Sequence, residues 1–476
     1  MGIIIGRKEE LRKLRELHES QRAEFVAVYG RMRTGKTYLV REAFNGHFTF
    51  MHTGRENQTT KQQLKAFAVT LNRQGLTDCT QLSSWSEAFS ALKKLIMKSD
   101  ERKKVIFLDE IAWMDNRKSD FLPAFEGFWN EWAAWRDDIL LIICASATSW
   151  ILKKVFHNRG GLHNRITAKM KIEQFTLAEC EEYVSSFNLG YSRDQILQLY
   201  MIIGGVAYYW TRLVPGFSTS QNIEYLFFSS TPALDGEFED CYTSLFSQPK
   251  NYLKIVEFLG KKGGSRTRTE IAEGCGIPNN GNLGDMLEEL EECGFLSSSH
   301  PLGKMKNDTY YRLMDSYTLF YFAFIKNNCY TESWSAIEAS SQYRTWCALS
   351  YERVIMMHIG AVKRKLGISG VATAVYCWTS DRKKLEEDQK GAQIDLLIDR
   401  ADNMINIVEV KWSKDGRAYL MTKEDEENLR NKKSVFQSQT KTRKGVCFVL
   451  ATVSGMKHNQ YSELIQKQVT LDDLFV

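Results

Sequence analysis

The sequence predicts an α/β protein with several domains. At roughly 150 residues per domain, its 476 residues correspond to about three domains. Near the N-terminus, a short apolar strand pattern leads through a glycine-containing loop into a helical pattern. Two continuous apolar stretches, at 104–111 and 139–146, have the composition of buried parallel strands. Alternating strand patterns return near the C-terminus, at 393–399 and 406–411.

The composition excludes several classes of protein. Hydrophobic residues make up 43% of the chain and charged residues 25%, the balance of an ordinary globular protein. The longest apolar run, 139–145, is far shorter than the roughly 20 residues that span a bilayer. The N-terminus is charged from Arg7 onward, too early for a secretory signal. We therefore expect a cytoplasmic protein that does not enter the membrane.

Charge and cysteine usage narrow the chemistry further. A net charge of +5 permits nucleic-acid binding without requiring it. The ten cysteines include no C-x-x-C pair, and the histidines form no H-E-x-x-H motif. We expect reduced thiols rather than a structural zinc site.

A phosphate-binding loop is predicted between the strand at 24–29 and the following helix. The sequence GRMRTGKT has the spacing G-x-x-x-x-G-K-[ST] in its required context, after a strand and before a helix. Glycines let backbone N–H groups turn toward phosphates, and the helix N-terminus adds its positive dipole end. Lys36 is expected to reach the β- and γ-phosphates of ATP, and the Thr37 hydroxyl to bind magnesium. The predicted ATP-binding loop consists of Gly30, Arg31, Met32, Arg33, Thr34, Gly35, Lys36 and Thr37.

Acidic and polar residues are expected at the same edge of the sheet. The strand at 104–111 ends in Asp109 and Glu110, and the strand at 139–146 ends in Ser146. Ligands bind at the carboxyl ends of strands in open α/β sheets. Asp109 is predicted to hold the magnesium shell, and Glu110, on the opposite side of the pleat, to polarise the attacking water.

These segments resemble the archaeal-type ATPases, a branch of the AAA+ P-loop ATPases. The similarity lies in the loop and in IIGRKEEL (4–11), VIFLDE (105–110), CASATSW (144–150) and GGLHNRIT (160–167). It implies a P-loop AAA+ core over 1–175 that uses ATP and Mg2+, with Gly6 and Arg7 near the adenine. It also implies that Ser146 senses the γ-phosphate and that Arg165 is the arginine finger or sensor, with Arg159 as the alternative. A finger acting on a neighbouring subunit would imply a homo-oligomer.

Residues 176–240 are expected to form the helical lid of the same family. The run from Leu177 to about Phe228 has helical character and contains GGVAY at 204–208. Val206 stands where these proteins usually carry proline, which leaves the hinge geometry of the lid open.

The segment 241–326 resembles a winged helix-turn-helix. Helical spacing occurs at 252–259, 267–272 and 282–294, and Thr267 or Thr269 is expected to cap the second helix. Two wing strands are predicted, the first in GFLS and the second at 309–313.

The third of these helices has the wrong charge for a DNA-reading helix. It carries five carboxylates and no Lys or Arg, whereas phosphate neutralisation supplies most of the affinity for DNA. This favours a packing role or a protein partner. Contact with DNA through basic loops remains an alternative, and the loop residues concerned are Lys261, Lys262, Arg266, Arg268, Lys304 and Lys306.

The last part of the chain carries a set of residues suited to a metal site. Glu409 and Lys411 lie two apart on one strand and therefore share a face, and a hairpin would bring Asp395 beside them. Asp395 and Glu409 are predicted to bind magnesium, with Glu352 from an earlier helix completing the shell. Lys411 would position or activate water and help to neutralise a phosphate.

This order of residues resembles the PD-(D/E)XK restriction-endonuclease-like fold, which ends the chain of many archaeal-type ATPases. The resemblance implies an α/β nuclease-like domain over 340–476. It departs from the motif at Ile394, where the motif name has proline; Gln437 and Gln439 are candidates for its later polar positions. DNA is the expected partner of this domain, through backbone contacts of Lys363, Arg364, Lys365, Lys441, Arg443 and Lys444.

Two functions are consistent with the whole sequence. In the first, ATP hydrolysis controls a nuclease-like domain that acts on nucleic acid. In the second, the protein is an ATP-dependent switch or protein-docking module whose nuclease fold is inactive.

Overall fold

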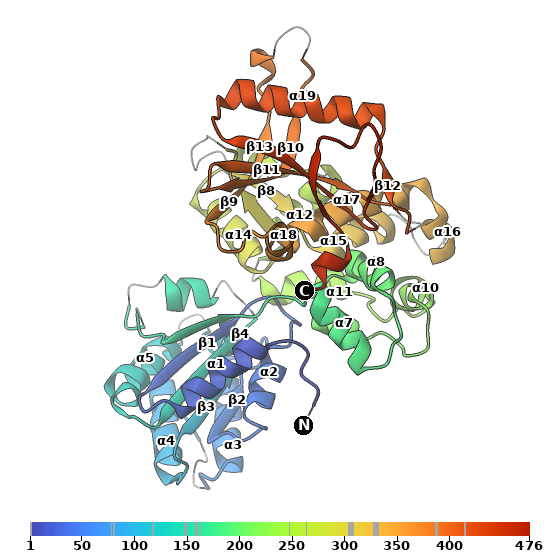
Figure 1. The fold of residues 1–476 in the computed structure, drawn as a ribbon. Helices are drawn as coiled ribbons and strands as arrows, with labels where there is room; N and C mark the ends of the chain where they lie inside the picture. Colours follow the sequence, from blue (N-terminus) through green and yellow to red (C-terminus); the bar gives the residue numbers. More distant parts are fainter. Residues whose placement is uncertain are drawn as a thin grey trace. The chain divides into compact units, whose positions relative to one another are not determined.

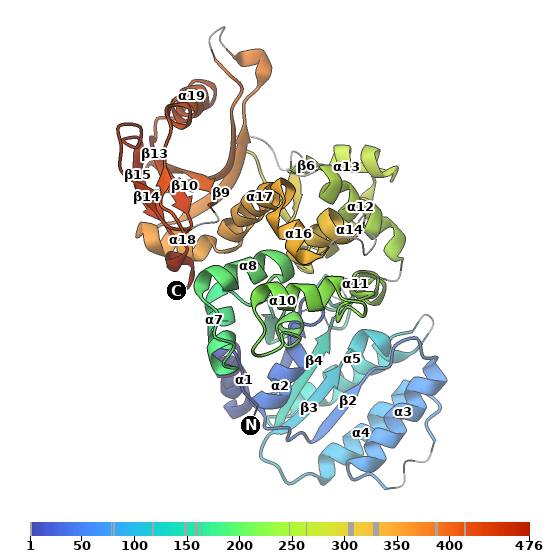
Figure 2. The same ribbon diagram turned by 90° about the vertical axis from the view of Figure 1, so that its right-hand side faces the viewer.

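The computed structural model describes residues 2–77, 79, 81–116, 119–146, 150–157, 160–162, 164–246, 248–262, 264–302, 309–326, 333–385, 389–413 and 416–476. The chain forms two compact units, and Figures 1 and 2 show their elements from two directions. Unit 1 contains residues up to 174 together with 240–249 and 292–294. Unit 2 contains 175–239, 250–291 and 295–476. Within the described ranges, every helix is too short or too polar to cross a bilayer.

Unit 1 is built on a parallel five-stranded sheet of order β2-β3-β4-β1-β5. β1 pairs with β4 and β5, and β3 pairs with β2 and β4, all in parallel. The carboxyl ends of β3, β4 and β1 therefore lie next to one another at one edge. The five strands are β1 (Glu24–Tyr29), β2 (Phe50–Thr53), β3 (Lys104–Asp109), β4 (Ile139–Ala145) and β5 (Ala168–Lys171).

Helices cover both faces of this sheet because its strands are apolar on both sides. On β1, Phe25 and Ala27 belong to one core, and Val26 and Val28 belong to the other. The first core packs under α3 (Thr60–Arg73), α4 (Trp85–Lys98) and α5 (Phe121–Glu131), and the second under α1 (Lys8–Glu19) and α2 (Lys36–Ala43).

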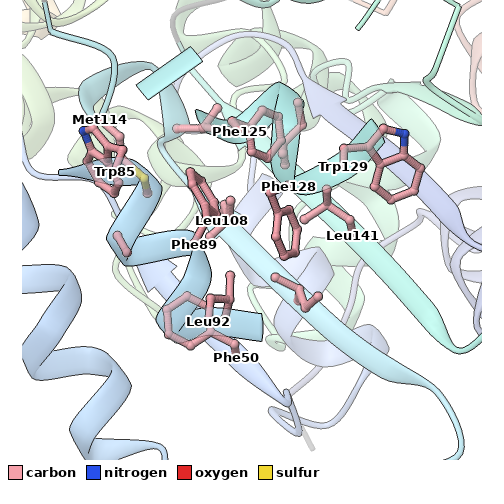
Figure 3. Close-up of a cluster of buried hydrophobic side chains, with 14 of the residues drawn as sticks. Phe50, Trp85, Phe89, Leu92, Leu108, Met114, Phe125, Phe128, Trp129 and Leu141 are labelled. Carbon is pink, nitrogen blue, oxygen red and sulfur yellow. The ribbon is translucent and has the colours of Figure 1, made fainter. Parts of the chain in front are cut away.

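The larger core is dominated by aromatic side chains (Figure 3). Trp85 and Phe121 meet edge to face at 4.9 Å, and Phe89 stacks on Phe128 at 5.2 Å. Each such buried side chain stabilises the fold by about 2 kcal/mol or more relative to exposure. This packing holds α4 and α5 firmly against the sheet that carries the strand ends.

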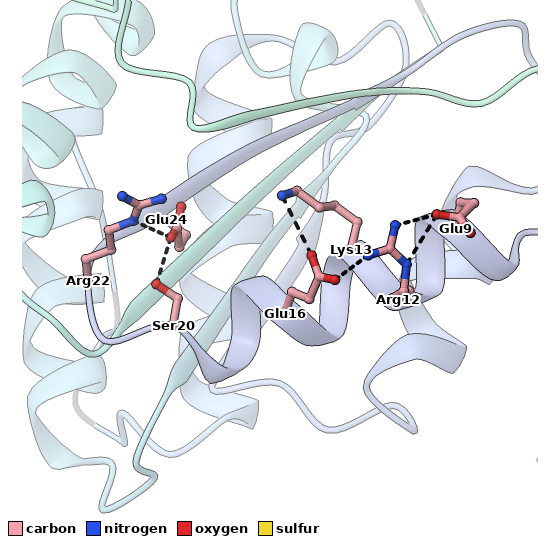
Figure 4. A network of polar contacts seen from close by, with 7 residues as sticks. All are labelled: Glu9, Arg12, Lys13, Glu16, Ser20, Arg22 and Glu24. Carbon is pink, nitrogen blue, oxygen red and sulfur yellow. Dashed lines mark hydrogen bonds and ion pairs between the residues drawn. The ribbon is translucent and has the colours of Figure 1, made fainter. Parts of the chain in front are cut away.

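Polar contacts on α1 and at the start of β1 are of two kinds (Figure 4). On the exposed face of α1, Arg12 bridges Glu9 and Glu16 at 2.5 Å each, a pairing that contributes little in water. Glu24 is buried, and it accepts hydrogen bonds from Ser20 at 2.7 Å and Arg22 at 2.8 Å. The hydrogen bonds to Glu24 hold the chain in place at the start of β1.

Unit 2 begins with the helical segment 175–239. Its main helices start at side-chain caps, as in α7 (Leu177–Ser186) and α8 (Arg193–Ile203), where Thr176 and Ser192 form capping boxes. Short helices α9 (Ala207–Trp210) and α10 (Thr219–Ile223) and a π-helical turn over Glu224–Phe228 follow. Val206 has a φ of −72°, within the range that proline would impose, so valine adopts this backbone geometry unaided.

The middle of unit 2 combines three helices with a three-stranded antiparallel sheet of order β6-β8-β7. The three predicted helices are present as α12 (Pro249–Lys262), α13 (Arg268–Cys275) and α14 (Gly281–Glu292). The two predicted strands correspond to β7 (Leu296–Ser299) and β8 (Tyr310–Leu313), and β6 (Arg266–Thr267) is a third strand that was not predicted. Thr267, rather than Thr269, caps α13, and it forms a capping box with Glu270.

Some acidic side chains of α14 take the packing role that the sequence favours as one of two alternatives. Glu289 is only 4% exposed and accepts a hydrogen bond from the Tyr252 hydroxyl. Glu291 accepts hydrogen bonds from the Ser298 hydroxyl and N–H at 2.6 and 2.8 Å. Two of the five carboxylates thus hold the small fold together instead of facing solvent.

The C-terminal part of unit 2 is a mixed five-stranded sheet of order β15-β13-β11-β10-β9. β10 pairs antiparallel with β9 and β11, whereas β13 pairs parallel with β11 and β15. Its core joins the sheet to α19, with Phe436 packed edge to face on Trp378. The strands are β9 (Thr373–Thr379), β10 (Gln393–Arg400), β11 (Met404–Lys411), β13 (Gly445–Thr452) and β15 (Ile465–Val469), beside a two-stranded sheet of β12 (Tyr419–Leu420) and β14 (Met456–Lys457).

Helices come before these strands in the chain, and a further α-helix lies between them. α15 (Ser316–Phe320), a π-helical turn at Tyr321–Ile325 and α16 (Trp334–Ala339) precede α17 (Ser341–Met357) and α18 (Ile359–Leu366). α19 (Lys423–Thr440) follows β12.

Candidate nucleotide site and candidate metal site

The predicted phosphate loop follows β1 and leads into α2. Gly30 has a φ of 131°, and a Cβ there would lie 2.5 Å from the carbonyl oxygen of Ile172. Gly35 has a φ of 89° and stands directly before α2. Both positions therefore require glycine, one for its conformation and a close approach and the other for its conformation.

Lys36 lies inside the curve of this loop. Its side chain is 4% exposed, and its ammonium group donates hydrogen bonds to the carbonyl oxygens of Gly30 at 3.0 Å and Arg31 at 2.7 Å. Thr34 donates to the same Arg31 carbonyl at 2.9 Å. The cation is thereby held at the first helical turn, where the N–H groups of α2 also point.

Thr37 and Asp109 meet across the gap between α2 and β3. The Thr37 hydroxyl donates to Oδ2 of Asp109 at 2.9 Å. Asp109 is 4% exposed; burial and then the charge of Glu110 raise its pKa, which the Thr37 hydrogen bond partly offsets. A hydroxyl and a carboxylate are oxygen ligands of the kind that magnesium prefers, so this pair fits a magnesium ion.

Glu110 and Ser146 form the second pair at this edge. The Ser146 hydroxyl donates to Glu110 Oε1 at 2.6 Å, and its N–H donates to Oε2 at 3.1 Å. The expectation that Glu110 continues the strand pleat is wrong: β3 ends at Asp109, and Glu110 takes a left-handed conformation with a φ of 46°. This turn aims the carboxylate at the end of β4.

The segment before α1 lies next to the loop. Arg7 has a φ of 58° and is buried, and its guanidinium donates to the carbonyl of Glu173 at 2.5 Å. Glu173 follows Ile172, whose carbonyl faces Gly30. The contact holds residues 6 and 7 beside the predicted phosphate loop, where the family resemblance expects the adenine.

The arginine expected to act as finger or sensor is not joined to these residues. Arg165 lies on an exposed turn, and its side chain makes no hydrogen bond or ion pair with any residue that the structure describes. Arg159, the alternative, lies outside the described residues, as do residues 147–149 after β4 and the two lysines of the predicted wing, Lys304 and Lys306. The identity of the finger stays a prediction.

In unit 2, Glu352 on α17 and Asp395 on β10 share one guanidinium. Arg312 of β8 donates to Glu352 Oε1 at 2.6 Å and to Asp395 Oδ1 at 2.9 Å. Burial and the charge of Asp395 raise the pKa of Glu352, and Arg312 opposes this rise. Gln393 also donates to Asp395, at 2.8 Å.

Glu409 and Lys411 point the same way on β11, as the strand period predicts. Their charged groups are 3.5 Å apart. Helix α19 adds Lys432, which donates to Glu409 at 2.7 Å, and Asp425, which lies 3.2 Å from Lys411. Burial lowers the pKa of Lys411, but the charges of Glu409 and Asp425 outweigh it and raise the pKa above its ordinary value. Lys411 is therefore a cation at neutral pH.

The structure brings the predicted metal residues close in pairs rather than as one set. Leu396 of β10 lies opposite Val408 of β11, so the neighbouring Asp395 and Glu409 belong to the same end of the hairpin. Among the described residues, however, no group of three or more acidic, histidine or cysteine side chains is placed to hold one ion. Magnesium is commonly bound by only one or two carboxylates and several waters, so the pair Glu352 and Asp395 still fits it chemically.

Sequence reasoning missed four of these neighbours: Arg312, Tyr419, Asp425 and Lys432. None of them belongs to an element that contributes a predicted metal ligand or Lys411, although α19 does carry the candidates Gln437 and Gln439. The only sequence signal for Asp425 is its position as capping-box partner of Thr422. The Tyr419 hydroxyl donates a hydrogen bond to the same carboxylate at 2.9 Å. Gln439, a candidate polar residue of the motif, instead bonds the backbone of Asp381.

Comparison with known proteins agrees with the N-terminal site. Residues 4–213 match the model of a family of ATPase domains found predominantly in Archaea. The chain is also 24% identical over 424 residues to an uncharacterised protein, MJECL04, of Methanocaldococcus jannaschii. That alignment covers 86% of this chain and 88% of the relative. The family match supports ATP binding and hydrolysis by the N-terminal part of the chain.

Two solved structures are similar to this fold at low sequence identity. The Walker-type ATPase PABY2304 of Pyrococcus abyssi has a TM-score of 0.49 and 16% identity, over 67% of this chain and 96% of that one. The ORC2 protein of Aeropyrum pernix has a TM-score of 0.42 and 13% identity, over 71% of this chain and 96% of that one.

Proposed function

We propose that the protein hydrolyses ATP with magnesium at the edge of the parallel sheet and uses its nucleotide state to control a nuclease-like domain in unit 2. The observation that carries the ATPase part is the 2.9 Å hydrogen bond between Thr37 and Asp109. It joins the end of the phosphate loop to the end of β3, two segments separated by more than 70 positions in the chain. These are the two oxygen ligands that magnesium needs beside a triphosphate.

Each residue at this edge has a separate part in the reaction. The loop N–H groups and Lys36 bind the phosphates, and Thr37 with Asp109 would hold magnesium, which neutralises the charge on the transferred group. Glu110 orients and polarises the attacking water. Ser146, which is hydrogen-bonded to Glu110, would bind the γ-phosphate in this proposal.

A titration of magnesium against the ATPase rate tests this assignment. In Asp109→Asn, the neutral amide is a poorer ligand, so the rate should fall and the magnesium requirement should rise. The exposed Asp100→Asn on the same domain is the matched control and should behave like the wild type. Wild-type hydrolysis by Asp109→Asn would show that the residue has no part in the metal shell.

Helical segment 175–239 is the proposed connection between the two activities. The family match extends to residue 213, into the segment that forms part of unit 2. There, the N–H of Leu177 at the start of α7 donates to Nε2 of His358 at 3.0 Å, directly after α17. Gln198 and Ser220 donate to Glu338 of α16 at 2.8 and 3.0 Å. Since α17 carries Glu352, movement of α7 would reach a residue of the candidate metal site.

The nuclease-like activity is proposed from two pairs of residues, Glu352 with Asp395 and Glu409 with Lys411. Two strand residues and one helix residue supply carboxylates, and Lys411 is a cation at neutral pH beside Glu409. A cavity of about 1230 Å³ adjoins Asp395, and its lining includes Arg266, Arg382 and Lys444. Those cations suit the sugar-phosphate backbone of a nucleic acid. The substrate class we propose is therefore a nucleic-acid strand.

A second candidate function is a nucleotide-dependent docking module with an inactive nuclease fold. The observation that favours it is that Arg312, Lys411 and Lys432 ion-pair with the predicted metal ligands. Under this hypothesis, the proposed winged helix binds a protein partner through its acidic helix α14. Cleavage of DNA and RNA with magnesium or manganese separates the two candidates. It should be measured with ATP, with ADP and without nucleotide; cutting under none of these conditions would favour docking.

A further inference from the structure

Arg312 reaches from the small antiparallel sheet into the candidate metal site. It lies on β8, the central strand of that sheet, opposite Ser297 of β7. Its two terminal nitrogens donate to separate carboxylates, Glu352 and Asp395, at 2.6 and 2.9 Å. The side chains are 13%, 19% and 33% exposed, so the three charges interact with little screening by water.

The guanidinium and a metal ion compete for the same two carboxylates, of which Arg312 contacts Glu352 Oε1 and Asp395 Oδ1. Magnesium or manganese binds carboxylate oxygens at about 2.0–2.2 Å, closer than any hydrogen-bond donor. An ion bound to both Glu352 and Asp395 would lie against the Arg312 guanidinium and be repelled by its charge. Each cation therefore weakens the binding of the other to this pair of carboxylates.

The position of Arg312 is set by a second set of contacts. Where the chain leaves β7, Leu302 N–H donates to the carbonyl of Cys377 on β9 at 3.3 Å, and Pro301 forms a β-bridge with the same residue. The Ser299 hydroxyl lies 3.3 Å from the Cys377 sulfur. These contacts attach the small sheet to β9, the edge strand of the larger sheet. Arg312 of β8 is thereby held close to Glu352 and Asp395.

We propose that Arg312 is an internal cation that competes with a divalent metal for Glu352 and Asp395. Glu352 and Asp395 bind a metal ion only after Arg312 has moved away from them, either alone or together with β8. The small sheet therefore regulates the candidate metal site. This inference rests on the proposed metal-binding role of the two acids. It adds a residue, a competing ligand and a direction of control that the metal-site motif itself does not contain.

Manganese binding to the full-length, nucleotide-free protein tests the competition directly. Calorimetry and the loss of the free-manganese EPR signal would give the dissociation constant. Arg312→Met keeps the length of the side chain and removes the charge, so it should bind manganese on the order of tenfold more tightly than the wild type, or better. The gain should disappear in Arg312→Met/Asp395→Asn.

Arg193→Met is the matched control. Arg193 also bridges two carboxylates, Glu181 at 2.7 Å and Asp472 at 2.9 Å, away from the candidate site. Its removal should leave manganese affinity unchanged. An affinity of folded Arg312→Met equal to that of the wild type would overturn the proposal, and so would a gain that persists after Asp395→Asn.

Loss of Arg312 leaves two partly buried carboxylates without their partner, so the variant will be less stable without metal. Manganese should then raise its unfolding temperature more than that of the wild type. If Arg312→Met does not fold even with manganese, Arg312→Lys decides. Its single ammonium cannot donate as a fork to both acids, so its manganese affinity should exceed that of the wild type; equality would overturn the proposal.

A cleavage assay on the same variants separates this inference from the proposed nuclease activity. Tighter manganese binding by Arg312→Met without cutting would support the competition and contradict the nuclease. Metal-dependent cutting by the wild type, with no change of affinity in Arg312→Met, would contradict the competition and support the nuclease.

Discussion

Ser146 and Glu110 are joined by two hydrogen bonds, one from the serine hydroxyl at 2.6 Å and one from its N–H at 3.1 Å. The residues come from the ends of β4 and β3, which pair in parallel. One residue of the pair is predicted to contact the γ-phosphate, and the other to polarise water. Their contact predicts that a phosphate bound to Ser146 would change the position or charge of the Glu110 carboxylate.

We expect Glu110→Gln to bind ATP and hydrolyse it slowly, by a factor on the order of 100 or more, because an amide does not accept the proton of water. Ser146→Ala should lower the turnover rate less, since it leaves the carboxylate in place but unanchored. Single-turnover hydrolysis and equilibrium ATP binding measure the two effects separately. Wild-type turnover by Glu110→Gln would show that another group activates the water.

Lys36→Met should weaken ATP binding by a factor between ten and about a hundred, the usual worth of hydrogen bonds to a charged group. The same change removes the hydrogen bonds of Lys36 to the Gly30 and Arg31 carbonyls. The unfolding temperature of the variant without ATP shows whether this loss also destabilises the loop. Lys61→Met, at an exposed position of α3, is the control. Fluorescent-nucleotide titration gives both affinities, and equal values for the two variants would contradict the role of Lys36.

Local sequence patterns predicted the parts of the nucleotide site that depend on adjacent residues. The loop from Gly30 to Thr37 is set by glycine conformations and by the strand and helix that flank it. The hydrogen bond between Ser146 and Glu110 was not predicted, because it depends on strand order and on the left-handed turn at Glu110. That turn is unusual for a glutamate, and no sequence period indicates it.

At the candidate metal site, too, local patterns predicted some features and missed those that depend on packing. The β10–β11 hairpin and the shared face of Glu409 and Lys411 follow from the strand period of two. Arg312 is 83 positions from Asp395 and belongs to a different sheet, so their ion pair depends on how two sheets pack. Charge complementarity between distant segments leaves no local pattern in one sequence.

The predicted arginine finger can be tested through assembly. If Arg165 acts on the nucleotide of a neighbouring copy, the ATPase rate per chain should rise with protein concentration. Arg165→Ala should then lower the rate at least tenfold with nearly unchanged ATP affinity, whereas Arg15→Ala on α1 should do neither. A flat rate from nanomolar to micromolar protein, with monomeric mass by light scattering, would argue against a finger supplied in trans.

His52 predicts a loss of stability at acid pH. It is buried, its Nδ1 lies 2.9 Å from the Thr70 hydroxyl, and its Nε2 has no partner among the described residues. Burial, and then the charge of Arg55, lowers its pKa from 6.5 to about 4. The unfolded chain therefore binds more protons below pH 6.5, and stability falls as the pH drops from about 6.5 toward 4.

The size of this effect follows from the shift. Between pH 7 and pH 5, His52 should account for about 2 kcal/mol of lost unfolding free energy. His52→Gln removes the titrating group, so the stability of this variant should depend less on pH than that of the wild type. The control His47→Gln, at an exposed position, should show the same pH dependence as the wild type. Denaturant unfolding at the two pH values gives both slopes. An unchanged pH dependence in His52→Gln would assign the acid sensitivity to other groups.

The last prediction concerns the candidate metal site. If unit 2 cleaves nucleic acid, cutting should require magnesium or manganese, because its carboxylates have no catalytic use without an ion. Asp395→Asn and Glu409→Gln should each abolish cutting through loss of a ligand charge. The exposed Asp402→Asn, in the turn of the same hairpin, should cut normally.

Lys411 should behave differently from the acids, because its ammonium is a cation rather than a ligand. Lys411→Ala should keep manganese affinity and lose cutting rate, since its charge acts on the phosphate and on water instead of on the ion. ATP hydrolysis should be nearly unaffected in all these variants, because Thr37, Asp109 and Glu110 belong to unit 1. Gel-based cleavage, manganese titration and an ATPase assay on one preparation separate the three quantities. Cutting that persists in Asp395→Asn would come from a contaminant or from another site, and it would refute the assignment of the acids.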